Sequence, residues 1–447
     1  MVFFTGLAAR RLRSILVQSW IAAAVLGCGG GGGGGGATSD SPDSVTAASV
    51  SSFAVDRSTI ATVPVVAAPF AAWTAALSDL AEDGTAYGVA APTVRTLTNQ
   101  TVRQVARAAV SGDSIRLKFS NQYGRSPITF TKVRVARTTG AGAIDVGSDM
   151  TITFGASPTV TIPAGTETWS DPVALPVAAG RDISVSVYVQ GSAEFITAER
   201  FSQQTQYTAS GDTTSAGNMS MTAASATRYW LAEMDVIRNG PTNVVVAFGD
   251  SITQGLGSTA GANRRYTDFL QARITQAATY PPTSIVNMGI TGNRWLHDVP
   301  GPRGVQRFER DVLRVTGVSH AVVLLGINDF GAQAITGQQV TAEAVMAAMS
   351  SIAAAGRKAG IEVVFGTLLP FKGHPVYSAQ NEAMRQAVNA WIRTNPSGAG
   401  FIDFDAALRN PADPGALLAA YDSGDHEHPS DAGYQRMAEA VDLATLR

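Results

Sequence analysis

The chain has 447 residues, 45% of them apolar, which is enough for two domains that each bury a core. Its formal charge is −2 and it contains no long run of Lys or Arg. We therefore expect no nucleic acid partner, because phosphate binding needs clustered basic side chains. Cys28 is the only cysteine, which excludes an intramolecular disulfide and a cysteine-rich zinc site.

Residues 1–28 have the order of a secretory signal peptide. Arginines at positions 10, 11 and 13 precede an apolar stretch, Ile15–Leu26, which is shorter than the about 20 residues that span a bilayer. The segment Val25-Leu26-Gly27-Cys28 resembles a bacterial lipobox, whose cysteine is lipidated after cleavage. This resemblance implies that Cys28 is lipidated; the alternative is a plain signal peptide in which Cys28 has no role.

Residues 29–68 have the composition of a flexible linker. An unbroken glycine run, Gly29–Gly36, precedes sequence rich in Ser, Thr, Asp and Ala, with no sustained apolar periodicity. Such a chain reaches roughly 35 Å on average, which suits a protein held away from a membrane surface. We expect attachment to the bacterial envelope through lipidated Cys28, or otherwise a periplasmic or extracellular protein.

Residues 69–240 alternate between apolar and polar side chains. Alternation is clear at 115–119 and 183–189. Short segments at 150–154 and 159–162 lie between turns that contain Gly, Pro or Asp, which is typical of short strands. Regularly spaced short strands predict an all-β sandwich domain. The segment Thr101–Val110 fits either a strand or a helix.

Residues 241–447 follow a different pattern, in which unalternating apolar segments are separated by helical ones. The predicted strands are Val244–Phe248, Ser284–Asn287, His320–Leu325, Glu362–Gly366 and Phe401–Phe404. The predicted helices are Tyr266–Ala277, Val305–Val315, Thr341–Ala359, Ser378–Thr394 and Ala432–Leu443. This alternation predicts an α/β fold, a three-layer sandwich with a parallel, flavodoxin-like sheet.

Polar segments follow the first three of these strands and precede the last helix. They read Gly249-Asp250-Ser251, Asn287-Met288-Gly289-Ile290-Thr291-Gly292, Gly326-Ile327-Asn328-Asp329 and Asp425-His426-Glu427-His428. In an open α/β sheet, ligand-handling residues collect at the carboxyl ends of the strands, so all four segments can meet at one edge. Each segment alone is also common turn or helix-cap chemistry. Their combination in this order indicates a functional site.

The four segments resemble the four sequence blocks of the SGNH hydrolases, also called GDSL-like esterases and lipases. The resemblance runs from the first predicted α/β strand to the C-terminus. It implies a serine esterase in which Ser251 is the nucleophile, His428 the base and Asp425 the partner of that base. It further implies that the oxyanion is bound by the backbone N–H groups of Ser251 and Gly289 and by the side-chain amide of Asn328. No cofactor and no metal are implied.

The residue types suit these roles. A serine hydroxyl is a weak nucleophile until a base removes its proton, and a carboxylate on the other imidazole nitrogen fixes the tautomer of that base. Asp425 precedes His428 by three residues, so one turn of chain brings both side chains to the same side, while His426 points elsewhere. An unperturbed histidine titrates at ~6–7, and activity is expected to rise there. We expect Asp250 and Asp329 to hold the loops.

Two alternatives concern the same residues. Asp425, His426 and His428 could form a metal site, but that would leave Ser251 and Asn328 unexplained. A generic α/β-hydrolase would need a Gly-x-Ser-x-Gly motif, which is absent around Ser251. The last block departs from the SGNH family in His426 and Glu427, where relatives often carry small or apolar residues.

The domain order, a β-sandwich before an SGNH domain, resembles bacterial esterases associated with xylan and other acylated polysaccharides. It implies short acyl groups on a small-molecule or polysaccharide ester. The alternative activities are those of a lipase, lysophospholipase or thioesterase. The non-enzymatic alternative is a carbohydrate-binding surface lipoprotein that kept the fold without the activity.

Overall fold

The computed structural model describes residues 66–82, 96–278 and 281–447. The predicted signal peptide, Cys28 and nearly all of the predicted linker lie outside these ranges. The described residues from Ala67 onward belong to one unit of contacts that ends at Arg447. Among the helices described, none is long and apolar enough to cross a membrane.

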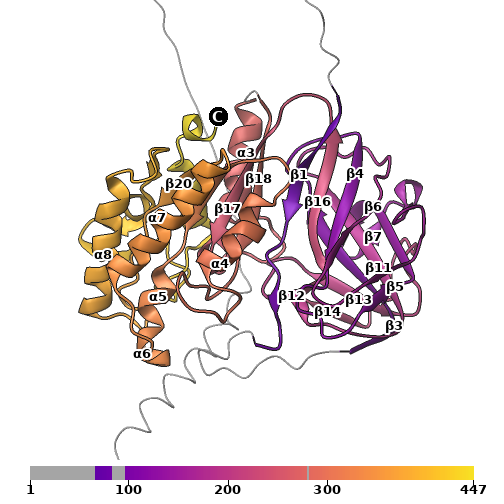
Figure 1. Ribbon diagram of the computed structural model, residues 1–447, viewed down its shortest axis with the longest axis horizontal. Helices are drawn as coiled ribbons and strands as arrows, with labels where there is room; N and C mark the ends of the chain where they lie inside the picture. The colour runs from indigo at the N-terminus through magenta and orange to yellow at the C-terminus, as the bar shows by residue number, and fades with distance from the viewer. Residues whose placement is uncertain (1–65, 83–95, 279–280) are drawn as a thin grey trace, which may run out of the picture. The chain divides into compact units, whose positions relative to one another are not determined.

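Residues 68–238 form an antiparallel β-rich domain (indigo to magenta in Figure 1). Its strands are β1 (Ala68–Thr74), β2 (Ser78–Asp79), β3 (Thr96–Arg107), β4 (Ser114–Ser120), β5 (Ile128–Phe130), β6 (Lys132–Gly140), β7 (Ala143–Ile144), β8 (Met150–Ile152), β9 (Val160–Ile162), β10 (Glu167–Trp169), β11 (Asp182–Glu194), β12 (Thr197–Glu199), β13 (Gln206–Ser210), β14 (Ala223–Ser225), β15 (Arg228–Tyr229) and β16 (Leu231–Arg238), with a 3-10 turn, η2, at Val146–Ser148. The ambiguous segment at Thr101 is a strand, since it belongs to β3.

Two sheets of this domain share one core. Their strand orders are β1-β16-β4-β10 and β14-β13-β3-β11-β6-β7. The alternation predicted for β4 is observed, because Ile115, Leu117 and Phe119 are fully buried while Arg116 pairs with Asp235. The same core contains apolar side chains of β3, β6 and β11, so the two sheets pack face to face.

The remaining residues form an α/β domain. Its strands are β17 (Asn243–Gly249), β18 (Thr283–Gly289), β19 (Val318–Leu324), β20 (Glu362–Gly366), β21 (Phe401–Ile402) and a hairpin of β22 (Arg409–Asn410) and β23 (Asp413–Leu417). Its helices are α2 (Ser251–Gln254), α3 (Tyr266–Gln276), α4 (Gly304–Phe308), the π-helical turn η3 (Glu309–Leu313), α5 (Ile327–Gly331), α6 (Gln333–Thr336), α7 (Ala342–Lys358), α8 (Ala379–Arg393), α9 (Phe404–Leu408), α10 (Asp431–Glu439) and the 3-10 turn η4 (Leu443–Leu446).

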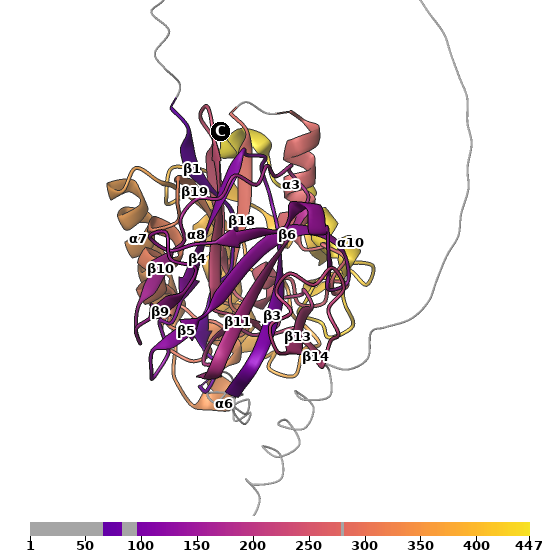
Figure 2. The same cartoon turned by 90° about the vertical axis from the view of Figure 1, so that its right-hand side faces the viewer.

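The sheet of this domain is parallel, with strand order β18-β17-β19-β20-β21. That order is the flavodoxin-like one, and it confirms the predicted fold class. Residues Val244–Phe248 of β17 are all buried, as expected for a strand covered on both faces. Helices α3 and α10 pack together on one side of the sheet, and α7 lies on the other (Figure 2).

Three predicted elements differ in extent. The helix predicted at Val305–Val315 is α4 followed by the π-helical turn η3. The strand predicted at Phe401–Phe404 stops at Ile402, because the side chain of Asp403 accepts a hydrogen bond from the N–H of Ala406 and so caps α9. The last predicted helix ends at Glu439, and a 3-10 turn follows.

Strand β1 contributes to the cores of both domains. Ala71 of this strand is buried in the α/β core, as is Ala76 just after it, whereas Ala72 and Trp73 are buried in the β core. The backbone of Ala71 is held by α/β residues, since its N–H donates to Thr316 O at 3.0 Å and its carbonyl accepts from Ser284 Oγ at 2.7 Å. The two domains are thus joined through a strand with two buried faces.

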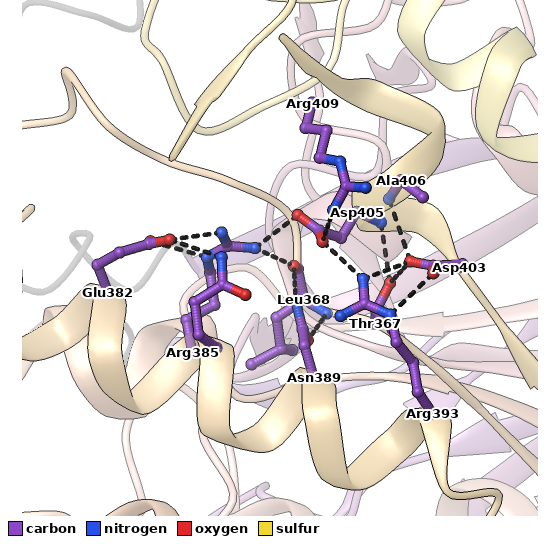
Figure 3. A network of polar contacts seen from close by, with 11 residues as sticks. Thr367, Leu368, Glu382, Arg385, Asn389, Arg393, Asp403, Asp405, Ala406 and Arg409 are labelled. Carbon is purple, nitrogen blue, oxygen red and sulfur yellow. Dashed lines mark hydrogen bonds and ion pairs between the residues drawn. The ribbon is translucent and has the colours of Figure 1, made fainter. Parts of the chain in front are cut away.

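A buried ionic network fixes helix α8 to the end of the sheet (Figure 3). The carboxylate of Asp405 accepts hydrogen bonds from Arg385 at 2.8 Å, from Arg393 at 2.7 Å and from Arg409 at 3.2 Å. The side chains of Asp405 and Arg385 are completely buried. Arg385 also donates to the carbonyl of Leu368, so one guanidinium links α8, α9 and the segment after β20.

We predict that Asp405→Ala lowers the free energy of unfolding by about 3 kcal/mol, because it leaves the guanidinium of Arg385 buried with fewer partners. Urea unfolding followed by circular dichroism measures the change. Glu309→Ala is the matched control, since it breaks the exposed pair with Arg314 and should cost at most about 1 kcal/mol. Equal losses in the two variants would contradict this account of the network.

Candidate active site

Ser251 lies at the junction of β17 and α2. The side chain of Asp250 accepts a hydrogen bond from the N–H of Ile252 at 3.1 Å and caps the helix. A Cβ on Gly249 would lie 2.2 Å from Thr253 Oγ1 and 2.3 Å from Leu324 O, so only glycine fits there. This tight turn places Ser251 at the carboxyl edge of the sheet.

The structure brings Ser251, His428 and Asp425 together. His428 Nε2 lies 2.8 Å from Ser251 Oγ, and His428 Nδ1 lies 2.6 Å from Asp425 Oδ2. The other oxygen of Asp425 accepts the backbone N–H groups of Glu427 at 3.0 Å and His428 at 2.8 Å. The aspartate therefore shapes the turn as well as orienting the ring. This arrangement can activate a hydroxyl for attack on a carbonyl carbon.

The charge of Asp425 stabilises the protonated form of His428. Burial of the ring favours its neutral form, but the hydrogen bond and charge of Asp425, together with the charges of Glu427 and Asp250, outweigh burial and raise the pKa of His428 to about 9. Burial likewise opposes ionisation of Asp425, yet its hydrogen bonds and the charge of His428 lower the pKa of this carboxyl. The histidine is thus more basic than the sequence alone suggested.

We predict that kcat/KM rises with pH and reaches half of its maximum near pH 9 rather than at pH 6–7, because His428 accepts a proton only when it is neutral. Glu427→Gln removes one of the negative charges that favour the imidazolium, so its profile should shift to lower pH. Initial rates across a pH series in constant-ionic-strength buffers test both expectations. A half-maximum at 6–7 in the unmodified protein, unmoved by Glu427→Gln, would contradict them.

His426 points away from Ser251, as predicted. Its Nδ1 lies 2.7 Å from Asp422 Oδ2, and its side chain is 53% exposed. Asp425 and His428 instead contact each other, so the three residues of the alternative metal site do not converge. Within the described ranges, no group of three or more His, Cys, Asp or Glu side chains is placed to hold a metal ion.

Asn328 supplies an unused buried donor. It lies in α5, and its Nδ2 is buried without a hydrogen-bond partner. Asp329, the next residue, accepts hydrogen bonds from the N–H groups of Trp295 at 2.8 Å and Leu296 at 3.2 Å. It therefore holds its own loop against the residues that follow the Asn287–Gly292 segment, as expected of an aspartate that holds the loops. Ser251 is the first residue of α2, and the backbone N–H of such a residue has no acceptor within its helix. Both donors suit a developing oxyanion.

Gly289 does not have the geometry predicted for an oxyanion donor. Its N–H donates to Asn287 Oδ1 at 2.9 Å, so this hydrogen bond is already satisfied within the loop. A Cβ at this position would lie 2.3 Å from the backbone nitrogen of Gln254. Gly289 therefore allows β18 to pack closely against α2. A second glycine of the same loop, Gly292, has φ 75°, a conformation that favours glycine.

Two further polar residues of the site were not predicted. Gln254 is buried at the end of α2 and bonds to the second loop and to the β domain. His374 lies beside the last block, with its Nε2 3.5 Å from Glu427 Oε2. Neither belongs to a sequence block, and the partner of Gln254 in the β domain precedes it by 55 residues. No local signal in the sequence identifies such contacts.

A large cleft lies in the β domain, away from the triad. It has a volume of about 960 Å³, and its lining includes Arg107, Arg137, Arg181 and Arg238. None of Ser251, Asp425 and His428 lines it. The cleft is therefore not the site built around Ser251.

Residues 247–436 match the sequence profile of the GDSL-like Lipase/Acylhydrolase family. Among solved structures, Axe2, an acetylxylan esterase from Geobacillus stearothermophilus, is similar at 23% identity over 46% of this chain and 94% of its own, with a TM-score of 0.34. The acetyl xylan esterase AlAXEase is similar at 21% identity over 44% of this chain and 96% of its own, with a TM-score of 0.35. A GDSL-like lipase from Bacteroides thetaiotaomicron is similar at 21% identity over 45% of this chain and 87% of its own, with a TM-score of 0.35. A comparison with curated protein sequences gave no match.

Proposed function

Because residues 247–436 form a domain of the GDSL-like lipase/acylhydrolase family, we propose that the chain is a serine esterase that hydrolyses carboxylic esters through an acyl-enzyme intermediate. The observation that carries this proposal is the unbroken series of hydrogen bonds from Ser251 through His428 to Asp425. The buried, unpartnered amide of Asn328 supports it further, because an oxyanion needs donors that are in place before reaction.

In the first step, Ser251 Oγ attacks the ester carbonyl carbon and gives its proton to His428 Nε2. The carbonyl oxygen becomes an oxyanion that accepts hydrogen bonds from Asn328 Nδ2 and the backbone N–H of Ser251. Asp425 accepts a hydrogen bond from the Nδ1–H of the imidazolium and stabilises its charge, while the proton stays on the ring. The imidazolium then protonates the leaving alcohol as the C–O bond breaks, and Ser251 is left acylated.

In the second step, water attacks the acyl carbon of the Ser251 ester. His428 takes one proton from this water, and the same donors hold the second oxyanion. Collapse of the intermediate breaks the bond to Oγ and returns the proton to Ser251, releasing the carboxylic acid. No ion or cofactor is needed by this sequence of proton transfers.

We propose short acyl groups, carried by a small molecule or a polysaccharide, as the substrate class. A protein that acts on lipid surfaces exposes apolar side chains around its site. Among the described residues, the exposed large apolar side chains are Val66, Val146, Met221 and Phe401, and none belongs to the segments that carry Ser251, Asn328 or His428. This distribution favours small acyl groups over long ones.

A series of p-nitrophenyl esters from acetyl to dodecanoyl, run beside acetylated xylan, tests the proposal. We expect kcat/KM to be highest for acetyl and to fall at least about tenfold by octanoyl, since each poorly fitted methylene costs of the order of 1 kcal/mol. Rates that rise with chain length would support the lipase alternative. A folded protein that binds xylan but hydrolyses no ester or thioester would support the carbohydrate-binding alternative.

We also propose attachment to the bacterial envelope through lipidated Cys28. The wild-type protein should incorporate radioactive palmitate and fractionate with membranes, and Cys28→Ser should abolish the labelling. Several acyl chains on one cysteine give stable attachment, whereas one chain is marginal. Unlabelled, membrane-free wild-type protein would show instead that the signal peptide is a plain one.

A further inference from the structure

Gln254 connects the β domain to the nucleophile helix. It ends α2, three residues after Ser251, and is 3% exposed. Its Nε2 donates to the carbonyl of Arg200 at 2.7 Å and to Glu199 Oε1 at 3.2 Å. Glu199 is the last residue of β12, so both acceptors come from the β domain.

The other end of the same amide holds the second loop of the site. Gln254 Oε1 accepts the backbone N–H of Thr291 at 2.9 Å and the hydroxyl of Thr291 at 2.6 Å. All four hydrogen-bonding positions of the amide are therefore used. Rotation by 180° would place the NH₂ group against the N–H of Thr291 and the oxygen against the carbonyl of Arg200, so the contacts also fix its orientation.

Glu199 is itself held by the core of the β domain. Its Oε2 accepts from Arg228 Nε at 3.0 Å, and Arg228 Nη1 donates to Val105 O at 2.8 Å. Arg228 is 1% exposed, and its guanidinium lies 4.4 Å from the ring centroid of Trp73. The carboxylate that Gln254 meets is therefore part of a rigid, buried structure.

These contacts leave little freedom between the two domains beside the site. The space lined by Ser78, Arg200, Gln254 and Thr291 has a volume of about 10 Å³, which is at the lower limit for holding one water molecule. Gln254 N–H also donates to Asp250 O at 2.9 Å, the residue before the nucleophile. The side chain of Gln254 thus bonds to the β domain and to the Thr291 loop, while its backbone N–H bonds to the turn that carries Ser251.

We propose that Gln254 is a positioning residue through which the β domain, by way of Glu199, fixes the nucleophile turn against the Thr291 loop. This inference rests on the proposed esterase function. A misplacement of reacting groups by about 1 Å can cost 10²-fold in rate, so the β domain contributes to catalysis without touching the substrate. The role differs from polysaccharide binding, because it acts on every ester, including small soluble ones.

The test uses p-nitrophenyl acetate and the variants Gln254→Met, Glu199→Ala and Thr291→Val. We expect kcat to fall about 10–100-fold in Gln254→Met and by smaller factors in the other two, with KM changed less than about threefold. Thr291→Ser keeps the hydroxyl and should restore most of the rate lost in Thr291→Val. Gln435→Met is the control, because Gln435 is an exposed glutamine on α10 whose side chain, among the described residues, bonds to Glu439 alone.

The kcat and KM values distinguish positioning from a purely structural role. Lower thermal stability with unchanged kcat at 25 °C in all three variants would overturn the proposal, as would a change confined to KM. If Gln254→Met fails to fold, the pair Thr291→Val and Thr291→Ser decides alone. Failure of the proposed esterase function would appear separately. The wild-type protein would then show no ester hydrolysis, or hydrolysis that persists in Ser251→Ala.

Discussion

Ser251→Ala will reduce kcat for ester hydrolysis by about 10⁴-fold or more while leaving the fold unchanged, because loss of one member of a triad removes nearly all of its contribution. The hydroxyl is the atom that forms and breaks the acyl bond, and no other side chain lies at hydrogen-bond distance from His428 Nε2 among the contacts of the described residues. Steady-state rates with p-nitrophenyl acetate measure the loss.

The substitution should not disturb the structure around it. Ser251 is only 4% exposed, but the helix it begins is capped by Asp250 and held by Gln254, and neither contact uses the hydroxyl. A thermal denaturation midpoint close to that of the wild type therefore serves as the control. A folded variant that keeps more than a trace of activity would remove Ser251 from the mechanism.

The second large effect is the difference in kcat between His428→Ala and His426→Ala. His428 lies between Ser251 and Asp425, so its loss should lower kcat at least about 10³-fold. His426 pairs with Asp422 and is half exposed, so its loss should change kcat less than about twofold. Both variants are compared at the same pH and checked for folding by circular dichroism.

The two histidines make this a demanding comparison, because they lie two residues apart in the same turn. The left-handed backbone of His426, with φ 68°, is what turns its ring away from the site. A severe effect of His426→Ala with a mild one of His428→Ala would show that the base is His426 and not His428. Similar losses in both would point to collapse of the turn rather than to loss of a base.

Much of the α/β domain follows from local sequence. The segment around Val244–Phe248 is apolar at every position, which already predicts a strand covered on both faces. The contact between Asp425 and His428 follows from their spacing of three residues, and the outward direction of His426 follows from the same turn. These features depend on neighbours in the chain.

The features that escaped prediction depend on contacts that no sequence block records, some within a loop and some between distant segments. The N–H of Gly289 is satisfied by Asn287 within the loop, which the pattern of glycines does not reveal. The contact between Gln254 and Glu199 joins two domains, and its donor and acceptor belong to no common motif. The raised pKa of His428 likewise reflects charges brought together by folding.

Covalent labelling at the nucleophile tests the central claim most directly. The protein is incubated with a fluorophosphonate, which phosphonylates activated serine hydroxyls, and the adduct is located by peptide mass spectrometry while residual esterase activity is followed. We predict one adduct per chain, on Ser251, with activity lost in proportion to labelling and no labelling of Ser251→Ala. Activity that survives complete labelling of Ser251, or that is lost with an adduct on another residue, would contradict the account.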